Sequence, residues 1–487
     1  MDRLLAATFL VALVVAGCAS PGGKDGPDDD VDDAPKGILS ASSLESISNQ
    51  ITVSVRGHRT SEFMVARNPL DPNNFVASGM DWDGGNGVVQ CTAFVSFDGG
   101  RGWEAVPALP GHGSSNEDTD PWVAFDDKGT AYLTCTEAGV GLLLGESRDG
   151  GRTWSEAKAV ATGGVPAKDA IGAFGDGELY LCFQQGTFRV LHSTDRGASW
   201  KEKSFPALAG CNGIVRGPDG RVYVVYQGGG AIEADRPSPP PPVLGVVSTI
   251  DNGTTWLETV ISEDLGAAPA TAPGLPQAAA PSLAVSQLTG TVWVGAQTYQ
   301  NAEIIGPLAS STRADGILLR SRDAGATWQE LKLPTGTSEE CANCHVVHPT
   351  LTIDDGGRLI VQFTRSDDLS LRKEVYIAAS DDEGDTWIDP LRVAVTTAEA
   401  SYLNPGNLLG EISGEPVEAI QEAMENPAQA QAILTSQATH LTWPVTHRDG
   451  GEYFGITTTP EAVLAMWVAH NNEGENVITA RLVKVHE

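Results

Sequence analysis

The sequence predicts an all-β protein, a single β-propeller of seven blades, each a four-stranded antiparallel sheet; six blades are the alternative. Three observations predict this fold. An octapeptide ending in Trp occurs six times, strand-turn-strand segments occur seven times, and the copies of the octapeptide are spaced by the length of one blade. The chain therefore reads as one repeat array of 487 residues and not as several unrelated domains.

The octapeptide has the pattern Ser/Thr-x-Asp-x-Gly-x-Thr/Ser-Trp, as in SRDGGRTW at 147–154, and Gly102 is its one departure at the seventh position. Its Asp can cap backbone N–H groups of a tight turn, and its Gly supplies a conformation closed to residues with a Cβ. The Trp buries a large surface between sheets. We expect structural roles for the six Asp residues, which lie 51, 46, 56, 72 and 59 positions apart: Asp98, Asp149, Asp195, Asp251, Asp323 and Asp382.

The strand-turn-strand segments are hairpins, since each has an apolar strand, a turn of Gly, Asp or Asn, and a second strand rich in β-formers. They lie at 62–79, 120–135, 169–183, 212–226, 280–295, 348–363 and 452–467. The last hairpin is followed by a single strand, 476–485, so its blade lacks a fourth strand. Residues 50–55 can supply that strand, and closing the ring with both chain ends removes the free sheet edge.

The octapeptide resembles the Asp-box, or BNR repeat, of sialidase-like β-propellers, and the resemblance covers most of the chain beyond residue 60. It implies that the repeats close turns on the side away from the mouth of the central channel. The resemblance also implies exo-sialidase activity, which is the hydrolysis of a glycoside. However, the Phe-Arg-Ile-Pro-like motif that usually carries the first sialidase arginine is missing. Arg365 is the best remaining candidate for an arginine at the mouth.

The N-terminus predicts an export signal and a lipid anchor. Arg3 precedes an apolar run at 4–16, and Val14–Cys18 resembles the lipobox of bacterial lipoproteins. We expect residues 1–17 to be the signal peptide, Cys18 to be acylated, and 18–45 to be an acidic disordered tether before a propeller at 46–487. The expected location is the bacterial cell envelope, at the periplasmic or exposed face of the outer membrane.

The net charge of −32 is spread along the chain and limits the partners. Such a surface repels nucleic acid and anionic lipid headgroups, so we expect no nucleic-acid partner and membrane attachment through the lipid alone. We expect a monomer. Three segments rich in Pro and Ala or helical in pattern, 228–243, 257–280 and 400–450, interrupt the blades and are expected to rim the mouth.

The residues that begin the seven hairpins point to an acidic mouth. In blade order they are Glu62, Asp120, Asp169, Asn212, Ala280, His348 and Glu452. Closure of a seven-membered ring makes the four carboxylates neighbours, and their repulsion requires a bound cation, a basic ligand or carboxyl groups with raised pKa. Asp81 and Asp118 in adjoining segments add oxygen ligands suited to calcium.

Two carboxylates across the same mouth also suit glycoside hydrolysis, and the pairs to consider are Asp120 with Glu452 and Asp169 with Glu62. The sequence thus predicts a surface-anchored platform that binds a glycan or protein ligand at the mouth. The alternative is an exo-sialidase-like glycoside hydrolase, with Asp120, Asp169, Glu62, Glu452 and Arg365 as the candidate catalytic residues.

The chain has seven cysteines. With Cys18 acylated, the other six lie in an oxidising compartment, where an even number fits disulfides. We expect the disulfides Cys91–Cys135, Cys182–Cys211 and Cys341–Cys344. The last pair lies in the pattern Cys341-x-x-Cys344-His345, which is also that of covalent haem attachment, with His345 as the proximal ligand. A short connection between blades lacks the apolar pocket that haem requires, and this favours the disulfide.

Overall fold

The computed structural model describes residues 42–83, 88–107, 109–110, 118–163, 166–206, 208–229, 242–263, 265, 280–300, 303–305, 308–310, 313–334, 345–366, 372–397, 454–470 and 476–486. The chain divides into two compact units, Met1–Ala41 and Ser42–Glu487, and every described residue belongs to the second. The described residues form strands and turns without a helix, and thus no helix long and apolar enough to cross a membrane.

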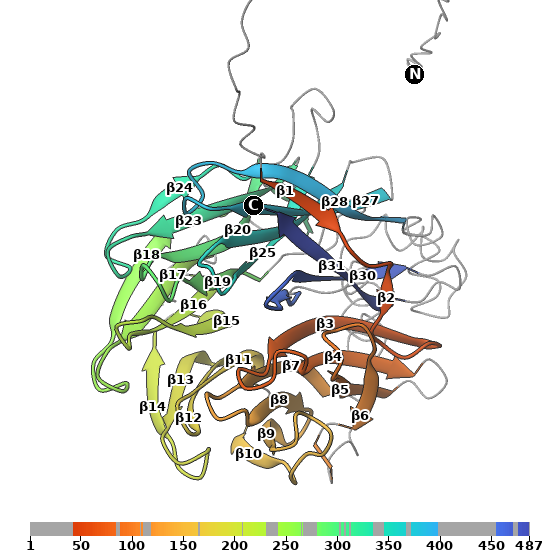
Figure 1. Ribbon diagram of the computed structural model, residues 1–487. Coiled ribbons are helices and arrows are strands. Elements are labelled where there is room, and N and C mark those ends of the chain that lie inside the picture. Colours follow the sequence, from red (N-terminus) through yellow and green to blue (C-terminus); the bar gives the residue numbers. More distant parts are fainter. Residues whose placement is uncertain are drawn as a thin grey trace, which may run out of the picture. The chain divides into compact units, whose positions relative to one another are not determined.

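In the described part of the chain, seven sheets stand around a central axis, which confirms the seven-bladed propeller (Figure 1). The first blade comprises β3 (His58–Arg67), β4 (Phe75–Asp83), β5 (Val88–Ser96) and β6 (Glu104–Pro107). The second comprises β7 (Asp118–Phe125), β8 (Ala131–Glu137), β9 (Gly141–Ser147) and β10 (Lys158–Ala161). The third comprises β11 (Ala167–Phe174), β12 (Glu178–Gln185), β13 (Thr187–Ser193) and β14 (Lys201–Phe205).

The next three blades repeat this order. The fourth comprises β15 (Leu208–Arg216), β16 (Val222–Gly229), β17 (Pro242–Thr249) and β18 (Leu257–Ser262). The fifth comprises β19 (Ser282–Val285), β20 (Val292–Gln300), β23 (Arg313–Ser321) and β24 (Gln329–Leu331). The sixth comprises β25 (His345–Ile353), β26 (Leu359–Ser366), β27 (Arg372–Ser380) and β28 (Ile388–Thr397). The first strand of each blade is innermost and contacts the first strand of the next blade.

The seventh blade is built from both ends of the chain. It contains β29 (Thr457–Thr458), β30 (Val463–His470) and β31 (Asn476–His486), and its outer edge is formed by β1 (Ser43–Ser46) and β2 (Ile51–Thr52), which both pair with β31. The register sets Ser43 opposite His486 and Ile51 opposite Ala480. The predicted closure is confirmed, but with two short strands in place of one, and the first begins at Ser43, before the expected domain boundary at residue 46.

The six octapeptides form turns after the third strands, and these turns define what we call the turn face of the ring. In the turn at Asp323, the Ser321 hydroxyl donates to Asp323 Oδ1 over 2.8 Å, and the Thr327 N–H and hydroxyl donate to the same carboxylate over 2.8 and 2.6 Å. The Thr327 hydroxyl holds the pKa of Asp323 at about 2, as the Ser199 hydroxyl does for Asp195. The six Asp residues thus close turns, as predicted.

Two inter-blade disulfides occur among the described residues, and both were predicted. Cys91 of β5 is bonded to Cys135 of β8, which ties the first blade to the second. Cys182 of β12 is bonded to Cys211 of β15, which ties the third blade to the fourth. Cys341 and Cys344 lie outside the described residues.

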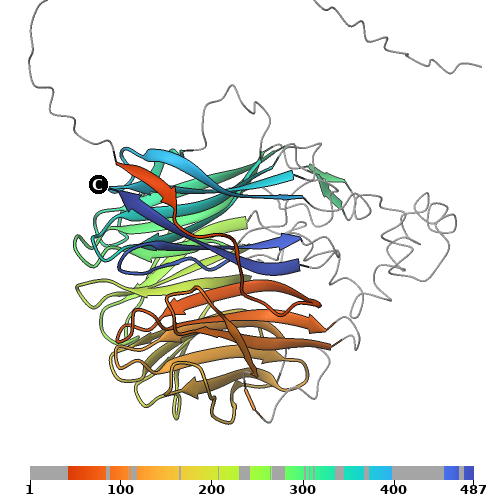
Figure 2. The same cartoon turned by 45° about the vertical axis from the view of Figure 1, so that its right-hand side comes forward.

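The predicted insertions are placed in part. The insertion 228–243 falls between β16 and β17, as expected for a connection between second and third strands. The insertion 257–280 was set too early, because Leu257–Ser262 is the fourth strand of its blade. The sequence analysis missed a small hairpin between β20 and β23, made of β21 (Glu303–Ile305) and β22 (Leu308–Ser310), which stands out from the ring in Figure 2. Residues 400–450 lie outside the described residues.

Ring closure generates a prediction about the N-terminal strands. Deletion of residues 19–52 removes β1 and β2, and we expect the melting temperature to fall by roughly 5–10 °C, because several backbone hydrogen bonds at about 1 kcal/mol each are lost. The open edge of β31 is also expected to cause concentration-dependent association. Calorimetry and light scattering measure both effects. Deletion of 19–41 alone is the control, and an equal loss in the two variants would contradict the role of these strands.

Candidate ligand site in the central channel

Five of the innermost strands carry a β-bulge at the same level of the ring. In β3, β7, β11, β15 and β25, two residues stand opposite one residue of the neighbouring strand. The bulged pairs are 62–63, 120–121, 168–169, 212–213 and 348–349. Bulges of this kind re-aim side chains and are common next to functional sites. We call Glu62, Asp120, Lys168, Asn212 and His348, the first residue of each pair, the bulge ring.

Four members of the bulge ring have a left-handed backbone. Their φ angles are 47° for Glu62, 54° for Asp120, 52° for Lys168 and 53° for His348. A side chain with a Cβ adopts this conformation at a cost of about 1–2 kcal/mol, and Gly is the residue that avoids the cost. Charged or titratable side chains therefore occupy positions where the backbone favours Gly.

The structure corrects the predicted alignment in the third blade. The sequence analysis aligned Asp169 with Glu62 and Asp120, but Lys168 has the equivalent left-handed position and Asp169 follows it. Asp169 takes the place that Phe63 and Pro121 have in the first two blades. The error arises because a bulge adds one residue to a strand, and side-chain alternation no longer identifies which of the two residues is first.

The surroundings of Asp120 in the bulge ring raise the pKa of its carboxyl group. Burial raises its pKa to about 6, the nearby Glu62 carboxylate contributes in the same direction, and the charge and backbone N–H of Lys168 oppose the rise. The Thr119 hydroxyl donates to Asp120 Oδ2 over 3.2 Å. The expected repulsion among mouth acids is present, and it is relieved in part by a lysine that the sequence analysis did not consider.

Asp169 is more deeply buried, with 1% of its surface exposed. Burial raises its pKa well above the ordinary value, and the Asp120 carboxylate adds to this effect. The Thr134 and Thr136 hydroxyls of β8 face it and lower its pKa, but neither carboxylate oxygen and neither hydroxyl has a hydrogen-bond partner. Asp120 and Asp169 are therefore brought together as predicted.

The remaining predicted ligands are placed differently. Asp81 Oδ2 lies 2.8 Å from His58 Nδ1, and its two oxygens accept hydrogen bonds from Thr60 and Thr92, so its carboxylate is already engaged. Asp118 is buried opposite Glu137 in the pairing of β7 with β8. Arg365 lies on β26, the second strand of its blade, with its guanidinium 5.4 Å from the centre of the Tyr376 ring. Glu452 lies outside the described residues.

Within the described ranges, no three His, Cys, Asp or Glu side chains gather as metal ligands, and the expected calcium site at the mouth, which includes Glu452 outside those ranges, stays a prediction. The arrangement of His345 does not favour haem ligation. Its side chain is fully buried, and Nδ1 accepts the N–H of Ala314 over 3.0 Å. Since a backbone N–H can only donate, the neutral ring carries its proton on Nε2, the nitrogen that would bind iron.

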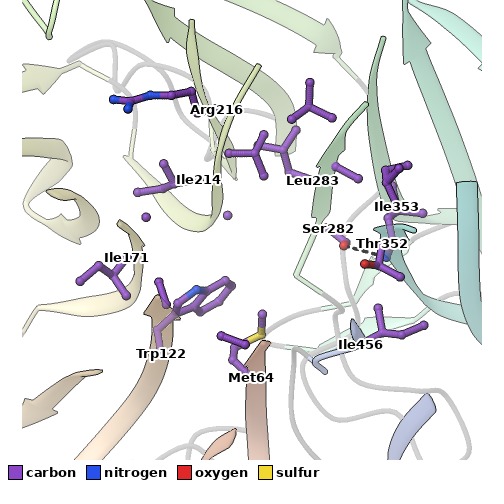
Figure 3. A pocket seen from close by; sticks show the side chains of 18 of the residues that line it. Met64, Trp122, Ile171, Ile214, Arg216, Ser282, Leu283, Thr352, Ile353 and Ile456 are labelled. Carbon is purple, nitrogen blue, oxygen red and sulfur yellow. Dashed lines mark hydrogen bonds between the residues drawn. The ribbon is translucent and has the colours of Figure 1, made fainter. Parts of the chain in front are cut away.

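A cavity of about 810 Å³ occupies the channel from the bulge ring, where Asn212 and His348 line it, toward the turn face. Its wall combines apolar and polar side chains, and Met64, Trp122, Ile171, Ile214 and Ile456 are directed toward the interior (Figure 3). Arg67 and Arg216 lie at its edge, where the innermost strands end. The sequence analysis expected the ligand site at the mouth and did not find this cavity. Its wall residues have the same composition as any buried strand.

The coupling between Lys168 and Asp120 generates a pH prediction. A carboxyl whose folded pKa is raised keeps its proton in the folded state between its unfolded and folded pKa values, so folding stability falls as pH rises from about 4 to about 6. In Lys168→Met we expect the folded pKa of Asp120 to rise further and the loss of stability to extend above pH 6. Denaturant unfolding between pH 4 and 8 measures this. Lys158→Met on exposed β10 is the control, and superimposable profiles for Lys168→Met and wild type would refute the coupling.

Comparisons with known proteins find likenesses of structure alone. No family model and no curated protein matches the sequence. Among solved structures, a protein of unknown function from Dyadobacter fermentans is 13% identical, covers 91% of this chain and 99% of its own, and has a TM-score of 0.47. A Hadza microbial sialidase is 15% identical, with 88% and 66% covered and a TM-score of 0.42. An α-L-arabinofuranosidase of Fusarium graminearum is 14% identical, with 67% and 93% covered and a TM-score of 0.42. At these values neither a function nor a substrate follows for this chain.

Proposed function

We propose that this protein is an envelope-anchored propeller that binds a glycan at the bulge ring of its central channel. The observation that carries the proposal is the left-handed backbone at Glu62, Asp120, Lys168 and His348. At each of these positions, a residue with a Cβ makes the fold less stable than Gly would, and strain of this kind is typical of functional sites. Its repetition at one level of four blades argues against chance at a single turn.

The chemistry of the ring suits a neutral glycan. Glu62 and Asp120 accept hydrogen bonds, Lys168 donates them, and His348 and Asn212 can do both. A sugar presents hydroxyl groups that donate and accept at the same time, so a mixed set of partners is complementary to it. The net charge of −32 and the three carboxyl groups at Glu62, Asp120 and Asp169 disfavour acidic sugars such as sialic acid. A basic protein segment is the other ligand compatible with these charges.

Glycoside hydrolysis is the second candidate function, and the acidity of Asp120 favours it. A general acid with a pKa of about 6 can hold a proton near neutral pH and deliver it to a leaving oxygen. A second carboxyl group nearby, Glu62 or Asp169, would then activate water or attack the sugar. Arg365 lies outside the channel-lining strands and is the weakest of the candidate catalytic residues.

The anchoring part of the proposal is supported by the sequence of the N-terminus. The apolar run at 4–16 and the lipobox-like Val14–Cys18 precede residues 19–41, and the described fold begins at Ser42. Acylation of Cys18 would join the ring to a membrane through a lipid, in the envelope of a bacterium.

Replacement of Asp120 tests the site. Asn keeps the size of the side chain and tolerates a left-handed backbone, so Asp120→Asn removes the charge and leaves the bulge intact. We expect at least a tenfold loss of affinity on a glycan array, and a 10²–10⁴-fold loss of kcat if any glycan is hydrolysed. Asp219→Asn at a partly exposed carboxylate on the turn face is the control. Unchanged binding and turnover in a folded Asp120→Asn variant would exclude the bulge ring as the site.

Replacement of Cys18 tests the anchor. We expect the wild-type protein to partition into the detergent phase of a membrane extract and Cys18→Ser to remain in the aqueous phase. Phase separation followed by mass spectrometry of the N-terminal peptide measures this. Aqueous partitioning of both proteins, with an unmodified peptide, would count against lipidation.

A further inference from the structure

The contact between the second and third blades differs from the contacts on either side of it. Cys91–Cys135 joins the first and second blades, and Cys182–Cys211 joins the third and fourth. Within the described residues no disulfide joins the second blade to the third. The polar groups buried at this contact, which we call the second seam, are Asp169 from β11 and Thr134 and Thr136 from β8.

The pleat of β8 directs these groups. Residues two apart on a strand share a face, so Thr134 and Thr136 point to the same side, toward Asp169. Cys135 between them points to the other side and reaches Cys91 of the first blade. Two hydroxyls and a carboxylate from adjacent blades therefore converge at the second seam.

The four oxygen atoms of this group are buried and unpartnered. Exposure is 1% for Asp169, 0% for Thr134 and 1% for Thr136, and Asp169 Oδ1, Asp169 Oδ2 and both threonine Oγ1 atoms are without a hydrogen bond. Buried polar atoms are nearly always paired, and an unpaired buried carboxylate is especially costly. The four atoms lie close enough for the threonines to affect the Asp169 carboxyl, yet they do not bond to one another directly.

Negative charge gathers beside this carboxylate. Lys168 acts on Asp120 through its charge and its backbone N–H, whereas the neighbour that acts most strongly on Asp169 is the Asp120 carboxylate. Glu62 adds a third negative group beside Asp120. Two adjacent carboxyl groups with hydroxyl oxygens around one of them form a set of hard oxygen donors, which is the ligand type that Ca²⁺ selects.

We propose that a calcium ion binds at the second seam, between both carboxylate oxygens of Asp169 and the hydroxyl oxygens of Thr134 and Thr136. Asp120 lies beside this site and adds negative charge, and water completes the coordination shell. The ion joins the second blade to the third where the neighbouring contacts have disulfides. With one direct carboxylate ligand, affinity is expected in the range of extracellular calcium modules, on the order of 0.1–1 mM. The proposal does not rest on glycan binding, although Asp120 also belongs to the bulge ring.

Thermal unfolding of the full chain after chelation tests the proposal. We expect the melting temperature to rise as CaCl₂ is raised from zero to 10 mM, because an ion that binds only the folded state stabilises it by mass action. Asp169→Asn is expected to abolish the rise, and Thr134→Val to shift it to about tenfold higher calcium. Asp219→Asn, which removes an equal charge from the turn face, is expected to keep the wild-type response.

Terbium provides a second measurement that does not depend on stability. Tb³⁺ replaces Ca²⁺ at oxygen sites and emits when a nearby indole is excited, and Trp122 stands directly opposite Thr134 in the pairing of β7 with β8. We expect sensitised emission in wild type, its loss in Asp169→Asn, and its loss in Trp122→Phe with the calcium-dependent rise in melting temperature retained. A wild-type protein that responds to neither ion refutes the proposal. A response that persists in Asp169→Asn also refutes it, since the ion would then bind elsewhere.

Discussion

Pairing between the two ends of the chain, β1 and β2 against β31, is the constraint on which the other features depend. Blades contact one another through their faces, and a ring of such contacts holds a channel of fixed width only when the last blade meets the first. The seventh blade joins residues more than 400 positions apart, with the Ser54 hydroxyl accepting the N–H of Ile478 and the Ser48 hydroxyl accepting that of Leu482. The bulges of separate blades can lie at one level because this closure fixes the level of every innermost strand.

The channel combines two environments that follow from strand geometry. On the turn-face side of the bulge ring, regular alternation directs apolar side chains such as Ile171 and Ile214 inward, and they line the cavity together with polar residues such as Arg67 and Thr352. At the bulge ring the alternation is interrupted, and Glu62, Asp120 and Lys168 occupy a level of the same channel. The bulges therefore bring charged groups into the centre of the molecule at a level where the backbone departs from regular pairing, and the left-handed residues there cost stability.

The architecture could be predicted from the sequence because each sign of it lies within a short segment of the chain. Seven hairpins, six octapeptides and an unpaired last strand lead to seven blades and to closure by both ends, and the inter-blade pairs Cys91–Cys135 and Cys182–Cys211 follow from blade order. The site was predicted less well. The acids Glu62, Asp120 and Asp169 do converge, but the shift from Asp169 to Lys168 requires knowledge of a bulge, which leaves no signature in residue type. The cavity was missed because inward-facing Met64 or Ile214 has the composition of any buried strand.

The shared seventh blade also makes the natural position of the chain ends arbitrary. Ser43 and His486 are cross-strand partners, so a short linker can join them, and new ends can be opened elsewhere in a circularly permuted chain. A cut between the second and third strands of a blade, such as between β16 and β17, would leave a blade that is again assembled from both ends. A cut between two blades would instead leave every sheet continuous in sequence, and at the first-to-second or third-to-fourth junction a disulfide would still hold the circle together.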